Sequence, residues 1–296
     1  AAAYAGALMT VASSSFFVAI GYAAFGNPYN LNHFVARSFY AVVTKFFNIH
    51  VEVEGEEYLE QKPAILMANH QSMLDIIICG RCVVPLLANI HAQLTWIRLM
   101  PKQAVIVSKD SLKYTPLGPF MMLSGSVFIN RGNSAAAVKR LDEAGNLIKH
   151  NKVSTWIFPE GTRHLSPKSD MLPLKKGGFH LAIGAGIPII PIVVENYYHI
   201  YHSGFFGEGT IKVKGKRPCN SWGRASLMNF SASSSSNPTV GLTRKDVGDL
   251  AVRVREQMVE TLHKISSHAV NPESEKTPSV AVPAQKPAIV KSESGS

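Results

Sequence analysis

The chain has 296 residues, of which 46% are hydrophobic, enough to bury the core of one sizeable domain with appendages but not of two full domains. Its three cysteines cannot form a disulfide framework, which excludes a disulfide-stapled secreted fold and favours a reduced compartment. The 30 basic and 20 acidic residues give a net charge of +10, which suits an anionic membrane surface or phosphate groups, whereas no nucleic-acid-binding motif accompanies the charge.

Residues 1–48 are predicted to associate with a membrane. Residues 1–25 carry no charge, and at ~1.5 Å per residue they would form a helix about 37 Å long, enough for a hydrocarbon core of about 30 Å. A signal peptide or a helical hairpin in one leaflet would explain the same segment. A second helix, Phe34–Phe47, is predicted to lie at the lipid interface, although a core-packing helix would show the same pattern. Arg37 and Lys45 favour a cytosolic location for the chain beyond residue 48.

The region from residue 49 to residue 268 alternates between short apolar strands and helices. Strands are predicted at 51–54, 63–68, 104–108, 126–130, 154–158, 187–194 and 210–214, and helices at 72–83, 134–150 and 175–185. Alternation of this kind is typical of an α/β fold with a mixed, largely parallel sheet flanked by helices. We therefore expect one catalytic domain over 49–268.

The end of the chain combines a helix with a tail. Thr243 to Asp246 resembles a capping box, and Val247 to Ile265 carries an apolar stripe at helical spacing, which predicts a helix that covers the core. Residues 269–296 are rich in Pro, Ser, Lys and Glu, and we expect them to be disordered.

A polar block, Asn69 to Asp75, directly follows the predicted strand that ends at Ala68. The ring of His70 could act as a general base, because an unperturbed imidazole with a pKa near ~6.5 is neutral at physiological pH. Asp75 could orient this ring, as the carboxylate does in serine hydrolase triads. Alternatively, Ser72 and Asp75 form only a helix capping box. Since no G-x-S-x-G elbow occurs, the base is predicted to activate a hydroxyl of a bound substrate.

A second block, Phe158 to Arg163, follows another predicted strand. Its Pro and Gly require a specific turn, the Arg163 guanidinium is a planar fork suited to phosphate, and Thr162 offers a hydroxyl. The alternative is a surface turn with a Glu160–Arg163 ion pair.

Two further cations stand at or near predicted strand ends, Lys109 and Arg131. Either of them could simply be solvated. Three cations at separate strand ends nevertheless indicate an anion site at one edge of the sheet.

These blocks resemble the 1-acyl-sn-glycerol-3-phosphate acyltransferase family, also called lysophosphatidic acid acyltransferases. The H-x-x-x-x-D block matches His70 to Asp75, and the F-P-E-G-T-R block matches Phe158 to Arg163 without a change. The family's middle and fourth blocks resemble residues 128–131 and 187–194, and the sequence between the blocks is similar to that of fungal members. Apparent insertions near 86–100 and 215–237 depart from the family pattern.

The resemblance implies transfer of an acyl chain from acyl-CoA to the sn-2 hydroxyl of 1-acyl-sn-glycerol 3-phosphate, which gives phosphatidic acid in phospholipid biosynthesis. It also implies that His70 is the general base and that Asp75 orients it. The acceptor phosphate would be held by a set of six residues. These are Lys109, Arg131, Glu160, Gly161, Thr162 and Arg163.

The same resemblance implies membrane lipid as a partner, a location at the endoplasmic reticulum with a cytosol-facing site, and acyl-CoA as co-substrate without a cofactor. Cys79-x-x-Cys82 has no second cysteine pair, which argues against a zinc site. Alternatives are a glycerol-3-phosphate or other lysophospholipid acyltransferase, an acyl-CoA hydrolase, and a non-catalytic lipid-binding protein.

Overall fold

The structure is a computed structural model, and it describes residues 31–59, 62–82, 104–115, 118–129, 134–216 and 242–267, together with 6, 10, 20, 21 and 29. Most of the predicted first helix, the insertion near 86–100, most of the one near 215–237 and the tail from 269 lie outside these residues. Among the residues that are described, no helix is both long enough and apolar enough to cross a bilayer.

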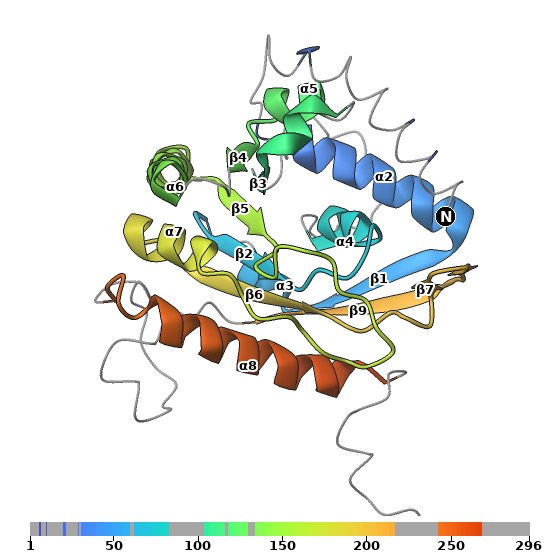
Figure 1. Cartoon of the computed structure of the whole chain (residues 1–296). Coiled ribbons are helices and arrows are strands. Elements are labelled where there is room, and N and C mark those ends of the chain that lie inside the picture. The colour runs from blue at the N-terminus through green and yellow to red at the C-terminus, as the bar shows by residue number, and fades with distance from the viewer. Residues whose placement is uncertain are drawn as a thin grey trace, which may run out of the picture.

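The described part of the chain is built on a seven-stranded sheet with the strand order β1-β9-β6-β2-β5-β3-β4 (Figure 1). The strands are β1 (Ile49–Glu54), β2 (Ile65–Ala68), β3 (Ala104–Lys109), β4 (Val127–Ile129), β5 (Ser154–Ile157), β6 (Ile189–Val194) and β9 (Gly209–Gly215). Strands β6, β2, β5, β3 and β4 run parallel, while β9 pairs antiparallel with β6 and parallel with β1. The predicted mixed, largely parallel sheet is therefore confirmed.

Both faces of the sheet are covered by helices. One face carries α2 (Leu31–Phe47) and α4 (Asp75–Cys82), and the other carries α6 (Ser134–His150), α7 (Gly177–Ala185) and α8 (Val247–Ile265) (Figure 1). Side chains of a strand alternate between the faces, so in β2 Leu66 packs under α4 while Ile65 and Met67 pack under α6 and α7. This double cover explains why β2, β5 and β6 are buried along their whole length.

Helix α2 packs on the core through one face. Phe39 and Val43 are fully buried against α4 and the sheet, while Phe46 at the helix end is 72% exposed. The core-packing alternative thus accounts for the buried face of this helix. Contact of its exposed face with lipid stays a prediction.

Helix α7 lies close to the sheet because Gly178 has no side chain. A Cβ at this position would stand 2.9 Å from the Met67 side chain, which is closer than packed atoms approach. The glycine therefore allows the helix to cover the strand that carries the Asn69 to Asp75 block.

The structure forms only one arm of the predicted capping box before α8. The amide and the hydroxyl of Thr243 both donate to Asp246 Oδ2, at 2.7 and 2.8 Å, whereas Asp246 occupies the cap position without a side-chain cap bond. The apolar stripe of α8 packs on the sheet as predicted, with Val254 and Met258 fully buried.

Five short elements were missed by the sequence prediction. They are α3 (Glu56–Leu59), a 3₁₀ helix at Asp110–Tyr114, α5 (Gly118–Leu123) and the hairpin of β7 (Tyr201–His202) and β8 (Phe205–Phe206). Elements this short carry no periodic pattern, because one turn or two residues do not repeat a face.

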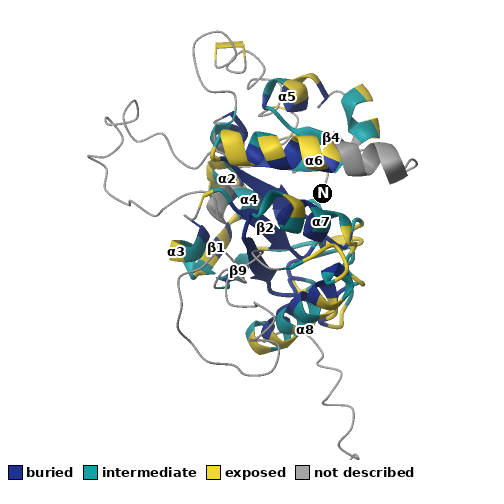
Figure 2. Ribbon diagram, turned by 90° about the vertical axis from the view of Figure 1, so that its left-hand side faces the viewer, coloured by how far each residue is buried: buried dark blue, intermediate teal, exposed yellow. Residues whose placement is uncertain are grey.

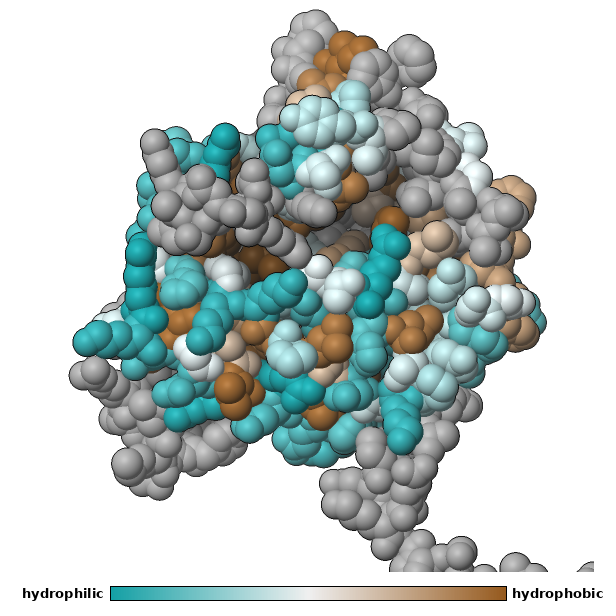
Figure 3. All heavy atoms as spheres, in the orientation of Figure 1, coloured by the Kyte–Doolittle hydropathy of each residue, from teal (hydrophilic) through white to brown (hydrophobic). Residues whose placement is uncertain are grey.

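The distribution of burial follows the layered fold. Figure 2 shows buried strands between helices whose outer faces are exposed. Figure 3 shows that hydrophilic residues cover much of one face of the molecule, with apolar residues between them.

Candidate active site

The two polar blocks meet because β2 and β5 are parallel neighbours. Their register pairs Met67 with Ile157, and beyond the ends of the two strands the His70 amide donates to Glu160 Oε1 over 2.8 Å. The carboxyl ends of parallel strands lie at one edge of the sheet, which is where α/β proteins place ligands. The backbone just after the second block is also bonded to the first block, since His164 N donates to His70 O over 2.8 Å.

His70 and Asp75 form a close pair at this edge. His70 Nδ1 lies 2.6 Å from Asp75 Oδ2, and the side chains are 19% and 3% exposed. The His70 ring stacks on Phe158, with the ring centroids 4.0 Å apart. Because a carboxylate only accepts hydrogen bonds, Nδ1 is the donor to Asp75, and in the neutral ring Nε2 keeps its lone pair.

Asp75 also caps the start of α4, so the two alternative roles suggested by the sequence coexist. Its Oδ2 accepts the amides of Gln71 and Ser72 at 2.8 and 3.2 Å, and Ser72 Oγ accepts the amide of Leu74 at 3.0 Å. The bond from the Ser72 amide is one arm of a capping box, whereas the serine hydroxyl accepts the amide of Leu74 in place of that of Asp75. The helix cap therefore fixes the carboxylate that holds His70.

Glu160 links the two polar blocks from a buried position. It is 3% exposed, its Oε1 accepts the amide of His70, and its Oε2 accepts the amide of Leu172, each over 2.8 Å. Burial raises the pKa of Glu160 above its ordinary value of 4.5, and the two amide bonds oppose that shift. Both carboxylate oxygens of Glu160 thus accept hydrogen bonds from backbone amides.

Gly161 gives the second block its turn. Its φ is +70°, in the region that favours glycine, and a Cβ there would stand 2.9 Å from Lys175 Nζ. The glycine therefore allows the Lys175 side chain to lie directly against the turn. Lys175 is exposed and was not among the predicted site residues.

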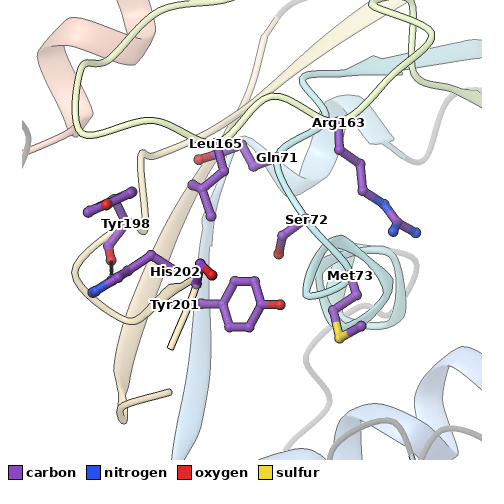
Figure 4. Close-up of a pocket in the computed structure, with 9 residues that line it drawn as sticks. Gln71, Ser72, Met73, Arg163, Leu165, Tyr198, Tyr201 and His202 are labelled. Atoms are coloured by element: carbon purple, nitrogen blue, oxygen red, sulfur yellow. Dashed lines mark hydrogen bonds between the residues drawn. The ribbon is translucent and has the colours of Figure 1, made fainter. Parts of the chain in front are cut away.

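A pocket of about 350 Å³ is lined by residues 71–73, which lie between His70 and Asp75 in the chain. Figure 4 shows Arg163 on one side of it, with Leu165, Tyr198 and Tyr201 on the other. The full lining is Gln71, Ser72, Met73, Arg163, Leu165, Tyr198, Tyr201, His202 and Ser203. The pocket thus combines one cation with an aromatic wall, an arrangement suited to a ligand that has both an anionic and an apolar part.

The other predicted cations are placed less completely. Lys109 is the last residue of β3, which pairs with β5, so its backbone lies at the same edge, while its side chain is outside the described residues. Arg131 also lies outside them, two residues after the end of β4. Thr162 is exposed in the turn before Arg163.

In the described residues, no group of three or more His, Cys, Asp or Glu could hold a metal ion.

Several site residues were missed by the sequence analysis. Tyr197, Tyr198, Tyr201 and His202 follow β6, whose carboxyl end lies beside that of β2. The strand-end rule that selected His70 applies equally to β6 and would have drawn attention to them. Their roles were not visible in the sequence, because only the fold brings them near the first block.

Asn69 ties the carboxyl ends of β2 and β6 together. Its side-chain amide donates to Val194 O over 2.9 Å, and its oxygen accepts the Val194 amide over 2.8 Å. The side chain therefore continues the pairing with β6 beyond Ala68, the last residue of β2.

The pKa of Glu160 predicts a pH-dependent difference in stability. Because its pKa is raised, Glu160 keeps its carboxyl proton to a higher pH in the folded state than in the unfolded state. The stability that this protonated carboxyl contributes is therefore fully present below pH 4.5, and it declines as the pH rises through the raised pKa. The free energy of unfolding of the wild type minus that of Glu160→Gln should therefore fall with pH. Urea unfolding at a series of pH values measures this difference, with Glu143→Gln at an exposed position as control. A difference that grows with pH would contradict the prediction.

Comparison with known proteins decides the family. Residues 50–195 match a family model described as Acyltransferase. The 1-acyl-sn-glycerol-3-phosphate acyltransferase of Saccharomyces cerevisiae is 38% identical over 240 residues, which cover 80% of this chain and 68% of that protein. The chain belongs to the 1-acyl-sn-glycerol-3-phosphate acyltransferase family. An uncharacterised acyltransferase of Schizosaccharomyces pombe is 33% identical over 82% of this chain and 76% of its own length.

A further sequence relative agrees with this assignment, and a solved structure shares the fold. The human 1-acyl-sn-glycerol-3-phosphate acyltransferase alpha is 31% identical over 75% of this chain and 66% of its own length. The crystal structure of the 1-acyl-sn-glycerophosphate acyltransferase PlsC from Thermotoga maritima shares the fold. Its TM-score is 0.53 at 19% identity, over 88% of this chain and 97% of that one. The chain is thus an acyltransferase, and the matched region contains His70, Asp75 and the whole second block.

Proposed function

We propose that this acyltransferase moves an acyl chain from acyl-CoA to the sn-2 hydroxyl of 1-acyl-sn-glycerol 3-phosphate and so forms phosphatidic acid. The observation that carries the proposal is the 2.6 Å bond between His70 Nδ1 and Asp75 Oδ2, at the sheet edge where the second block begins. The named relatives support the acceptor, since 1-acyl-sn-glycerol 3-phosphate is part of their names.

In the proposed reaction, His70 Nε2 removes the proton from the acceptor hydroxyl while the hydroxyl oxygen bonds to the thioester carbonyl carbon. The tetrahedral intermediate then collapses, the carbon–sulfur bond breaks, and the sulfur leaves with the proton from the imidazolium. Asp75 keeps the ring oriented and offsets the positive charge that forms on it. The products are phosphatidic acid and coenzyme A, and the base is regenerated without a cofactor.

A direct attack by the acceptor is favoured over a covalent enzyme intermediate. In the described residues, no serine, threonine or cysteine side chain bonds to the His70 ring. Ser72 is the nearest in sequence, and its Oγ is engaged by the Leu74 amide and the Tyr197 hydroxyl. The hydroxyl that His70 activates is therefore proposed to belong to the lipid.

Arg163 is proposed to grip the acceptor phosphate, together with Gly161 and Thr162 of the same turn, Lys109 and Arg131. A guanidinium in the pocket wall can bind a phosphate through two parallel hydrogen bonds. Glu160 would contribute indirectly, by holding the turn against the His70 backbone.

The conservative change Arg163→Lys should mainly raise the KM for the acceptor, by roughly tenfold, because a point charge replaces a bidentate fork. Steady-state kinetics with each substrate varied in turn measures the effect, with Arg244→Lys in an exposed ion pair as control. A rise confined to the KM for acyl-CoA would reassign Arg163 to the donor.

The proposed acceptor is a membrane lipid, so we propose that the protein works at the endoplasmic reticulum with its site toward the cytosol. The net charge of +10 favours an anionic membrane surface. The exposed Phe46 at the end of α2 would allow that helix to touch lipid.

The test of the proposed function is coenzyme A release from oleoyl-CoA by the detergent-purified protein, with and without 1-acyl-sn-glycerol 3-phosphate. Release that requires this acceptor supports the proposal. Release at the same rate without any acceptor would identify a hydrolase. Release with glycerol 3-phosphate or another lysophospholipid in its place would identify a different acyltransferase.

A further inference from the structure

Tyr197 makes a buried contact with the dyad carboxylate that the proposed reaction does not use. Its side chain is fully buried, and its hydroxyl donates to Asp75 Oδ1 over 2.7 Å. The same hydroxyl lies 2.9 Å from Ser72 Oγ, which accepts the Leu74 amide. The phenol has one hydroxyl proton, which forms the hydrogen bond to Asp75. Ser72 must therefore be the donor in its bond with Tyr197. The result is a chain of hydrogen bonds that ends on the carboxylate.

The two carboxylate oxygens of Asp75 have different hydrogen-bond partners. Oδ2 accepts His70 Nδ1 and the amides of Gln71 and Ser72, whereas Tyr197 is the side chain that donates to Oδ1. A donor on Oδ1 withdraws negative charge from the oxygen that faces the imidazole. It also fixes the rotation of the carboxylate plane. Tyr197 can thereby govern both how well His70 is oriented and how readily it takes a proton.

The fold holds Tyr197 rigidly in this position. It follows β6, the neighbour of β2, and its ring packs in the core cluster that includes Ile77 of α4 and Val194 of β6. A side chain locked by packing keeps its hydroxyl at a constant distance from Asp75. This is the arrangement that a preorganised site requires.

We propose that Tyr197 is a positioning residue that acts through Asp75 to set the orientation and the proton affinity of the His70 base. The proposal rests on the proposed function. The other titratable groups near His70 do not bond to its ring. Glu160 accepts the His70 backbone amide, and the His164 backbone amide donates to the His70 carbonyl. Arg163 lines the adjoining pocket.

The experiment is Tyr197→Phe, which keeps the ring and removes only the hydroxyl. Turnover should fall on the order of tenfold, a fraction of the effect of losing the base, while both KM values stay unchanged. The acid limb of the kcat/KM profile should move to higher pH, because a more negative Asp75 favours the imidazolium. The matched control is Tyr40→Phe, which removes a hydroxyl beside the same core cluster without touching Asp75. A Tyr197→Phe enzyme with wild-type rate and pH profile would overturn the proposal.

A double-mutant cycle separates positioning from a general structural effect. In an Asp75→Ala background, Tyr197→Phe should change turnover less than about twofold, because the residue through which it acts is gone. An equal loss in both backgrounds would overturn the proposal and leave Tyr197 with a structural role.

If Tyr197→Phe does not fold, 3-fluorotyrosine placed at position 197 keeps the hydroxyl and makes it a stronger donor. The acid limb should then move to lower pH, and an unchanged limb would again overturn the proposal. In all these tests, acceptor-dependent coenzyme A release by the wild type reports on the proposed function separately. Its absence would overturn both proposals, whereas its presence with no effect at Tyr197 would overturn only this one.

Discussion

Replacing His70 with alanine is expected to lower turnover by roughly 10²- to 10⁴-fold, the range that a general base contributes. The ring donates to Asp75 through Nδ1, so its Nε2 is the nitrogen available to a hydroxyl at the sheet edge. Alanine leaves no group there to take the proton. The KM for the acceptor should change little, because the phosphate is proposed to be held by Arg163.

Coenzyme A release under saturating acyl-CoA and acceptor measures this effect. His150→Ala removes an exposed histidine from the end of α6 and serves as control. Circular dichroism and thermal unfolding show whether the His70 variant is folded. Wild-type turnover in a folded His70→Ala enzyme would refute the general-base assignment.

Replacing Asp75 with asparagine should lower turnover by up to roughly 10⁴-fold, the loss that the same change causes in a hydrolase triad. Oδ2 accepts two backbone amides besides His70, so the amide oxygen of asparagine should occupy that place and its NH₂ group should face Tyr197. The ring would keep its orientation but lose the negative charge that offsets the imidazolium. The acid limb of the kcat/KM profile should therefore move to lower pH.

The measurement is the pH dependence of kcat/KM for Asp75→Asn beside that of Asp142→Asn, whose carboxylate is in an exposed ion pair with Arg244. Because Asp75 also caps α4, thermal unfolding is recorded for both variants. A loss of stability with an unchanged rate per folded molecule would assign Asp75 to the helix cap alone.

Much of the fold could be predicted from local patterns. Helix α6 was predicted with the bounds it has in the structure, because seventeen residues give several turns of periodic signal. Each strand of the main sheet was located, since short runs of apolar residues bounded by polar ones are typical of strands under helical cover. The hairpin of β7 and β8 was missed, because its two-residue strands exist only through their pairing with each other.

The partners of Glu160 could not be predicted from its neighbours in the sequence. The sequence placed it beside Arg163 in a turn, which suggested either substrate contact or a surface ion pair. The structure instead buries it, with its two oxygens on the backbone amides of His70 and Leu172. These partners lie 90 and 12 residues away in the chain, so only the parallel pairing of β2 and β5 brings the first of them within reach.

By itself, the sequence determined the residue types of the two blocks, the alternation of strands and helices, and the edge of the sheet at which the blocks would meet. These depend on residue types and local periodicity, which do not involve distant parts of the chain. Only the tertiary structure decided which residues support the dyad. Tyr197 lies 122 residues from Asp75, and its hydroxyl reaches the carboxylate because β6 and β2 are neighbours in the sheet. Such contacts depend on strand order, which no local pattern encodes.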